Sequence, residues 1–185
     1  MALKATIFKA VLQIADMDRS YYHDHALTIA RHPSETDERM MVRVLAFALQ
    51  ASEGLVFGKG LSTDDEPDIW EKDLTGAIRT WIDVGQPDEK RVRRACGRAD
   101  RVFVYSFGAN AASAWWDQVE SKLARMQNLT VVKLPSASTR ELAQLANRNM
   151  HLSCTVQESQ IWMSDENRAV TLQPEIVQSP APAMR

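Results

Sequence analysis

The stretch from Trp81 to Arg98 constrains the fold of this 185-residue chain more than any other part. It begins with apolar, β-forming residues around one acid, Asp83, and the motif Gly85-Gln86-Pro87 then ends this strand and opens a helix. Proline suits the first helical position because its missing N–H would be unpaired there anyway, and the preceding glutamine is the expected N-cap. The stretch therefore predicts a strand that leads directly into a helix.

An alternation of strands and helices continues beyond this helix. The near-continuous apolar run Val102–Tyr105 is typical of a strand that is buried on both faces. Apolar residues at helical spacing follow between Ala112 and Met126, and Leu129–Leu134 is a second apolar strand. Such a βαβ unit has two parallel strands and a right-handed crossover, so the sequence predicts an α/β protein.

Two hairpins are expected in the first half of the chain. Ala5–Ala15 and Tyr21–Ala30 are rich in β-branched and aromatic residues and predict the first one. Ile69–Thr75 and Ala77–Val84 predict the second, with its turn at Gly76.

The remaining segments are assigned from capping signals and apolar periodicity. Ser34–Ala51 and Ser138–Asn147 each predict a helix that is capped by its first serine. Met150–Met163 and Ala169–Val177 predict two strands, and the proline-containing end, Ser179–Arg185, predicts a disordered tail.

Composition is that of an ordinary globular protein, with 45% apolar and 25% charged residues. We expect a single α/β domain over residues 1–178, with a mixed central β-sheet flanked by helices. The net charge of −2 argues against a generally basic nucleic-acid coat but leaves room for a local basic patch. Cys96 and Cys154 are too few for a disulfide framework or a zinc cage, and no signal peptide or apolar run of about 18 residues is present. We therefore expect a cytoplasmic protein that is not bound to a membrane.

Three acids are candidates for a Mg²⁺ or Mn²⁺ site. Asp68 follows Pro67, and the predicted hairpin places it and Asp83 at neighbouring strand ends, where carboxylate oxygens suit these ions. Glu53 ends the first predicted helix just before Gly54, where an acid opposes the helix dipole. This conflict indicates a task such as facing a cation, and the alternative is a solvated terminal side chain.

Several long motifs in order resemble the bacterial YaeQ family, and the resemblance extends from the N-terminus to about residue 178. They are Arg31-His32-Pro33-Ser34-Glu35-Thr36-Asp37-Glu38-Arg39, Glu53-Gly54-Leu55, Gly60-Leu61-Ser62, Glu66-Pro67-Asp68-Ile69-Trp70 and Trp81-Ile82-Asp83-Val84-Gly85-Gln86-Pro87. The resemblance implies a variant of the PD-(D/E)xK nuclease core with a mixed central sheet. It carries no established reaction, although a role in transcription elongation has been suggested for the family.

Carried over from the resemblance, Glu53, Asp68 and Asp83 match the acidic positions of the nuclease core. The usual lysine, which orients the attacking water and offsets developing charge, is replaced by Gly85. Gln86 lies one place beyond it and could hydrogen-bond the water.

A cation displaced from the lysine position could come from the helix that follows. Lys90 or Arg91, one turn into this helix, could reach back toward the acids. Arg91, Arg94 and Arg98 share one helix face that could contact phosphates, and the alternative is a solvated basic face.

These residues support two functions. The first is a Mg²⁺- or Mn²⁺-dependent phosphodiesterase that acts on nucleic acid. The second is a catalytically inactive protein of the same fold that binds nucleic acid or a transcription-related partner. The acidic residues favour the first function, and the overall charge and the absent lysine favour the second.

Overall fold

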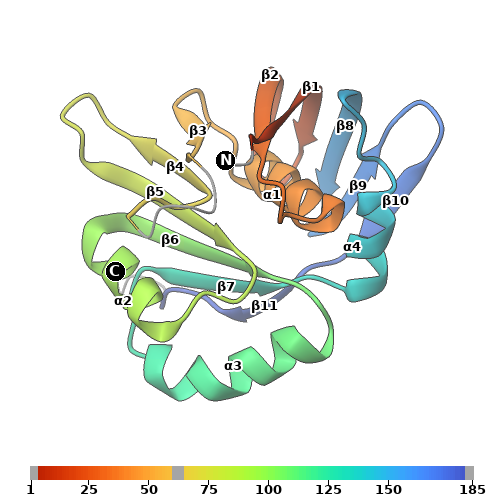
Figure 1. Cartoon of the computed structure of the whole chain (residues 1–185). Helices are drawn as coiled ribbons and strands as arrows, with labels where there is room; N and C mark the ends of the chain where they lie inside the picture. Colours follow the sequence, from red (N-terminus) through yellow and green to blue (C-terminus); the bar gives the residue numbers. More distant parts are fainter. Residues whose placement is uncertain (1–3, 60–64, 182–185) are drawn as a thin grey trace.

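The structure of the chain is a computed structural model that describes residues 4–59 and 65–181. In this part of the chain, eleven strands form two mixed β-sheets, and four helices pack on them (Figure 1). The α/β class and the single domain are as the sequence predicts. None of the helices described is long and apolar enough to cross a bilayer.

The first sheet has the strand order β10-β9-β8-β1-β2. The predicted N-terminal hairpin is confirmed, because β1 and β2 pair antiparallel over their whole length, and β1 also pairs parallel with β8. Alternate residues of β1 are buried and exposed, so only one face of this sheet is covered. Its strands are β1 (Thr6–Asp16), β2 (Tyr21–Arg31), β8 (Asn149–Gln157), β9 (Gln160–Ser164) and β10 (Ala169–Leu172).

The second sheet has the strand order β11-β7-β6-β5-β4-β3. Its centre is parallel, because β5 pairs with β6 and β6 with β7 in the orientation that the βαβ pattern predicts. The other strands add antiparallel edges, including the predicted β4–β5 hairpin. Its strands are β3 (Leu55–Phe57), β4 (Ile69–Lys72), β5 (Ile78–Val84), β6 (Ala99–Ser106), β7 (Leu129–Lys133) and β11 (Glu175–Gln178).

The helices divide the molecule into layers (Figure 1). The helix α1 (Asp37–Gln50) lies between the two sheets, with α4 (Ser136–Ala143) beside it. The helices α2 (Glu89–Arg98) and α3 (Asn110–Leu123) cover the opposite face of the second sheet. The end of β5 is therefore flanked by α1 on one side and by α2 on the other.

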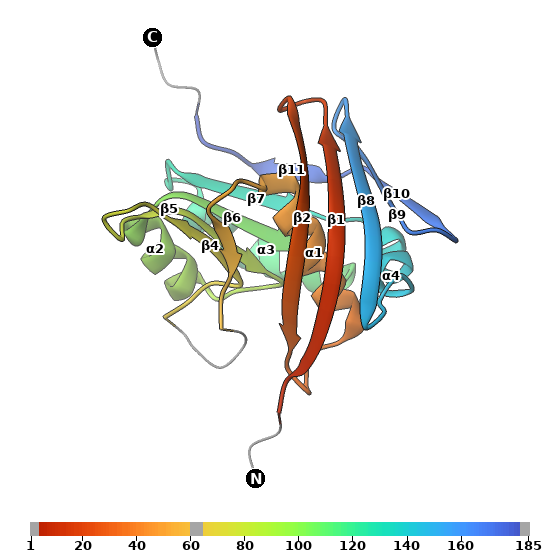
Figure 2. The same cartoon turned by 90° about the horizontal axis from the view of Figure 1, so that it is seen from above.

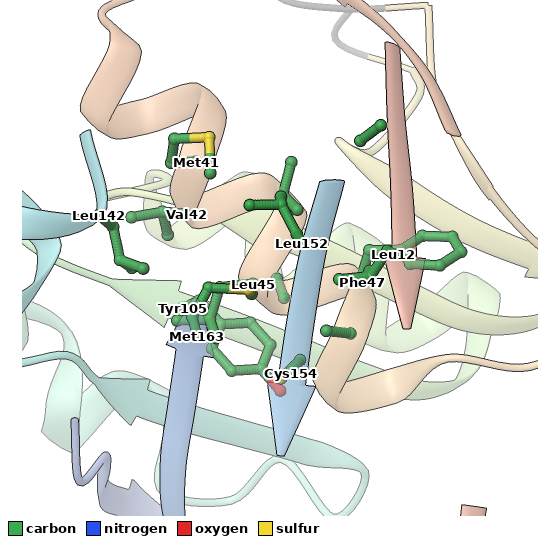
Figure 3. Packing of buried hydrophobic residues seen from close by; sticks show 14 of the residues in the cluster. Leu12, Met41, Val42, Leu45, Phe47, Tyr105, Leu142, Leu152, Cys154 and Met163 are labelled. Atoms are coloured by element: carbon green, nitrogen blue, oxygen red, sulfur yellow. The ribbon is translucent and has the colours of Figure 1, made fainter. Parts of the chain in front are cut away.

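Two apolar cores hold these layers together. In the first, Leu12 and Leu152 of the first sheet lie with Leu45 and Phe47 of α1, and Tyr105 contributes from the second sheet (Figure 3). The second core fills the space between the second sheet and the helices α2 and α3. Its members include Trp81, Val104, Val92 and Trp115.

The expectation of one central sheet is wrong, because the N-terminal hairpin pairs with β8 in a sheet separate from that of β3 to β7 and β11. The C-terminal strands are also more finely divided than predicted. Glu158 and Ser159 have φ angles of 51° and 64°, and this turn splits the expected strand Met150–Met163 into the hairpin of β8 and β9. The expected strand Ala169–Val177 breaks before Glu175, so that β10 joins the first sheet and β11 joins the second. Pro174, which lacks a backbone N–H, lies at this break.

The predicted helix caps are also corrected. Thr36, and not Ser34, caps α1, and Asp88, and not Gln86, caps α2. In both helices the capping oxygen accepts a hydrogen bond from the backbone N–H of the third helical residue, which the predicted residues lie too far upstream to reach. Ser138 lies inside α4 and donates to a strand carbonyl instead. Most of the predicted disordered tail, residues 182–185, lies outside the described residues.

Candidate functional site: an acid–arginine cluster at the end of the second sheet

The two acids of the predicted hairpin come together at one end of the second sheet. In the β4–β5 ladder Ile69 is paired with Ile82, so the next position places Asp68 opposite Asp83. Both side chains are buried, with exposed fractions of 9% and 4%. Because buried carboxylates need partners, what surrounds them decides what this site can do.

Asp83 is bound by an arginine from the first turn of α2. Arg91 donates from Nε to Oδ2 and from Nη2 to Oδ1, both at 2.9 Å. The indole Nε1 of Trp81 donates to the same Oδ2 at 3.0 Å, and Arg91 also reaches the backbone oxygen of Glu66. Such a two-point contact is among the strongest pairings of arginine with a carboxylate.

Asp68 is bound by an arginine from the opposite side of the sheet. Arg39, in the first turn of α1, donates from Nη2 to Oδ1 and Oδ2 at 2.9 and 3.1 Å. The backbone N–H of Val84 donates to Oδ2 at 2.8 Å, so Asp68 also holds the end of β5. The two acids are thus tied to different helix layers.

A third buried acid, Glu35, completes the cluster and was missed by the sequence reasoning. It accepts from Arg39 Nη1 at 2.9 Å and from Nε and Nη2 of Arg43 at 2.7 Å each. Arg43 is itself almost fully buried and also donates to the carbonyl of Ala30. The spacing of Glu35, Arg39 and Arg43 at intervals of four residues was visible in the sequence and is the signal that could have found them.

The electrostatics of the cluster follow from its burial and its balance of charge. Burial raises the pKa of the Asp83 carboxyl, the ion pair with Arg91 opposes this rise, and the nearby Asp68 carboxylate adds to it. Burial alone lowers the pKa of the Arg39 guanidinium, but Asp68 and Glu35 outweigh it and raise this pKa. Three acids therefore face three arginines, and the cluster is neutral as a whole.

Gly85 and Gln86, at and next to the position where the resemblance implies a lysine, are held by contacts with β6 and the residue after it. Gly85 has a φ of +101°, which favours glycine, and its N–H is bonded to the carbonyl of Tyr105. The Gln86 amide donates to the Phe107 carbonyl and, at 3.4 Å, to Ser106 Oγ, so it ties the ends of β5 and β6 together.

Of the two predicted displaced cations, only Arg91 lies on the acids. Lys90 is exposed and makes no ion pair or hydrogen bond with any described residue. The other members of the predicted basic face turn toward Asp65: Arg94 lies 3.9 Å from its carboxylate, and Arg98 donates to its carbonyl.

Glu53 is not brought together with Asp68 and Asp83. It is exposed and follows the C-terminal end of α1. Arg39, which binds Asp68, lies in the first turn of this helix of 14 residues, so Glu53 and Asp68 lie at opposite ends of a helix about 20 Å long. Burial raises the pKa of the Tyr21 hydroxyl and Glu53 adds to this rise, which places Glu53 near the start of β2. Within residues 4–59 and 65–181, no three His, Cys, Asp or Glu side chains gather to hold a metal ion. The carboxylates of Glu53, Asp68 and Asp83 are therefore not placed to hold one metal ion together.

Comparison with known proteins gives a consistent family assignment. The sequence profile of the family described as YaeQ protein matches residues 1–174. The protein named Uncharacterized protein YaeQ from Salmonella typhi is 45% identical over 181 residues, which cover 98% of this chain and all of the relative. Its namesake from Escherichia coli K12 is 45% identical over 166 residues, covering 90% and 92% of the two chains.

Two crystal structures have the same fold. That of the YaeQ protein from Xanthomonas axonopodis pv. citri superposes with a TM-score of 0.93 at 49% identity, covering 95% of this chain and 99% of the other. That of the YaeQ protein from Pseudomonas syringae gives a TM-score of 0.90 at 34% identity, covering 95% and 97%.

Proposed function

The chain belongs to the YaeQ family, and we propose that it is a variant of the PD-(D/E)xK nuclease fold that binds nucleic acid without cleaving it. The arrangement of the second sheet supports this fold: a parallel centre, a hairpin that carries two acids at one end, and helices on both faces of that end. Fold alone does not give activity, so the proposal rests on the acid–arginine cluster.

The observation that carries the proposal is that a guanidinium occupies both oxygens of Asp68 and of Asp83. Mg²⁺ and Mn²⁺ need these same oxygens in a well-defined geometry, together with water. An ion at this place has to displace both arginines, and each displaced guanidinium then loses a buried partner. The cluster therefore acts as an internally neutralised structural unit that fixes the end of β5 between α1 and α2.

The exposed surface of α2 is the proposed contact with nucleic acid. Lys90 and Arg98 form no ion pair with a carboxylate among the described residues, and the Arg94 side chain is 51% exposed. A hydrogen bond to a backbone carbonyl, as Arg98 makes, leaves the positive charge unneutralised. Such charges bind phosphates and release counterions, which makes the affinity depend on salt.

Fluorescence anisotropy tests this contact. The probes are labelled single-stranded and double-stranded DNA and RNA, measured in chelator and over a range of salt concentrations. We expect Arg94→Ala and Arg98→Ala each to weaken binding and to lower the salt slope by about one. Arg140→Ala removes the same charge from the exposed surface of α4 and is expected to leave both quantities unchanged. Equal losses in all three variants, or no binding of any of the four nucleic acids, contradict the proposal.

A metal-dependent phosphodiesterase is the second candidate, because Asp68 lies opposite Asp83 and raises its pKa. Two carboxylates that repel each other have some affinity for a divalent cation. In this case Arg91 and Arg39 have to leave their acids before an ion can bind. Mn²⁺-dependent cleavage that requires Asp83 distinguishes this candidate from the first.

A further inference from the structure

The helix α1 fills only part of the space between the two sheets. A helix is about 10 Å wide, so it holds the sheets further apart than two sheets that pack directly on each other. At the C-terminal end of α1 a cavity of about 290 Å³ remains between them. Figure 2 shows β11 and the turn between β1 and β2 at this end of the molecule. We name this space the inter-sheet cavity, and it is lined by Gln50 of α1, Val156 and Ile161 of the first sheet, and Tyr105, Thr130 and Val132 of the second.

The walls of the inter-sheet cavity are mainly apolar and aromatic. In the second sheet Phe103 is paired with Thr130, and Tyr105 with Val132, so these four side chains share one face and form one wall. Val156 of the first sheet closes another side. An apolar cavity with a few polar groups is the usual form of a small-molecule site, and the two rings offer a surface on which a flat molecule can pack.

Two polar side chains of the cavity have hydrogen-bonding capacity left for a ligand. Gln50 donates from Nε2 to the Tyr105 hydroxyl at 2.9 Å. This contact uses one amide hydrogen, so the hydroxyl proton of Tyr105 and the Oε1 atom of Gln50 bond to no other described residue. Tyr105 is only 2% exposed, so bulk water does not meet this need. A ligand group that both donates and accepts a hydrogen bond, as a hydroxyl does, matches the pair.

The charged residues that line the cavity are already bonded. Asp16 accepts from Arg19 Nε at 2.8 Å, and Arg19 also donates to two carbonyls at the C-terminal end of α1. Asp18 accepts two backbone N–H groups from the turn between β8 and β9, and it is in no ion pair with a described residue. Two acids therefore stand against one base, which disfavours the entry of an anion.

We propose that the inter-sheet cavity binds an uncharged two-ring molecule that carries one hydroxyl group, such as a bicyclic phenol. The size follows from the volume, which is about twice that of a cavity of about 150 Å³ that accepts benzene. The hydroxyl follows from the open capacity of Gln50 and Tyr105, and the lack of charge follows from the acids at the cavity. This site is separate from the acid–arginine cluster, whose residues do not line it.

Isothermal titration calorimetry of the full chain with 2-naphthol and 2-naphthoate tests the chemistry of the ligand. We expect 2-naphthol to bind with a dissociation constant below about 1 mM. The carboxylate of 2-naphthoate is ionised at neutral pH, so this probe of similar size should bind at least about ten-fold more weakly. No binding of 2-naphthol at about 1 mM overturns the proposal, and 2-naphthoate that binds as tightly as 2-naphthol overturns the preference for an uncharged molecule.

Three variants test the place of binding. Thr130→Phe adds a ring to the wall and should weaken 2-naphthol binding at least about ten-fold. Gln50→Leu removes one hydrogen-bonding partner and should weaken it roughly two- to ten-fold. Thr28→Phe makes the first substitution at an exposed position of β2 that does not line the cavity, and it should bind like wild type.

NMR amide shifts of the wild-type chain locate the ligand without any variant. We expect 2-naphthol to shift the signals of Gln50, Thr130 and Val132 and to leave that of Thr28 in place. Far-UV circular dichroism shows whether each variant is folded. Binding that is equal in wild type and a folded Thr130→Phe, or shifts that lie outside the cavity, overturns the proposal.

Discussion

Arg91 holds both carboxylate oxygens of Asp83 at 2.9 Å, from the helix that begins just after the strand carrying the acid. The exposures of the two side chains differ: Arg91 is 22% exposed and Asp83 only 4%. Arg91 can therefore regain contact with water if its partner is lost, whereas the carboxylate cannot. Removing Arg91 should therefore cost more stability than removing the charge of Asp83.

We expect Arg91→Met to destabilise the protein by about 3 kcal/mol at neutral pH, because it leaves Asp83 buried without its cation. Asp83→Asn should cost about 1 kcal/mol or less, since the amide keeps an oxygen for Trp81 and removes the buried charge. The double variant should resemble Asp83→Asn alone. Urea denaturation of the three variants and wild type measures these differences, and equal costs for the two single variants contradict the account.

The loss in Arg91→Met should depend on pH. Burial already raises the pKa of Asp83, and removing the arginine that opposes this rise raises it further. A carboxyl whose pKa is higher in the folded than in the unfolded protein lowers stability at high pH, and this effect disappears as the pH falls through the folded-state pKa. The difference between wild type and Arg91→Met should therefore shrink toward acidic pH. A constant difference from neutral to acidic pH would exclude Asp83 as its cause.

Glu35 should matter more to stability than Asp83, because its partner Arg43 is only 3% exposed and cannot regain contact with water. Its carboxylate is 1% exposed and holds two arginines, so Glu35→Gln should destabilise by about 3 kcal/mol. The neighbouring Asp37 pairs with Arg31 at the surface, and Asp37→Asn should cost less than about 1 kcal/mol. Urea denaturation of both variants makes the comparison. Similar values for the two would mean that Glu35 is not part of a buried network.

The backbone at Gly85 disfavours a lysine, the residue that the nuclease resemblance implies at this position. A Cβ atom added here meets no atom within 4 Å, so Gly85→Ala and Gly85→Lys should both cost about 1–2 kcal/mol from the left-handed backbone. Thermal melts of the two variants check this equality. Wild-type stability in Gly85→Ala would show that the backbone does not select glycine at this position.

The sequence predicts the parts of the fold that depend on local composition. The hairpin of β4 and β5 follows from its apolar runs and from Gly76. Asp68 and Asp83 lie eight and seven residues from Gly76, and a register shift between Glu71 and Lys72 brings them opposite each other.

The turn at Glu158 and Ser159 was not predicted, because neither residue is a typical left-handed turn residue. The signal that could have found it is the polar run Gln157–Gln160, after which the buried positions change from even-numbered to odd-numbered residues.

The candidate site is less predictable because its partners come from distant elements. Nothing local indicates that Arg39 reaches Asp68, 29 positions away in the chain, since this contact depends on how α1 packs between the sheets. Glu53 was selected from a conflict with the helix dipole, but that conflict is small for an exposed side chain at the surface. Local patterns thus locate the acids, and only tertiary packing shows what neutralises them.

The most direct test of the central claim follows binding and cleavage of labelled nucleic acid in the same samples, with either Mn²⁺ or chelator present. If arginines neutralise Asp68 and Asp83, the bound fraction should be the same in both conditions and no product should form. Wild type and Asp83→Asn should then behave alike. The account is contradicted if wild type forms product with Mn²⁺ but not with chelator, and if Asp83→Asn forms none. That result would establish a metal-dependent phosphodiesterase.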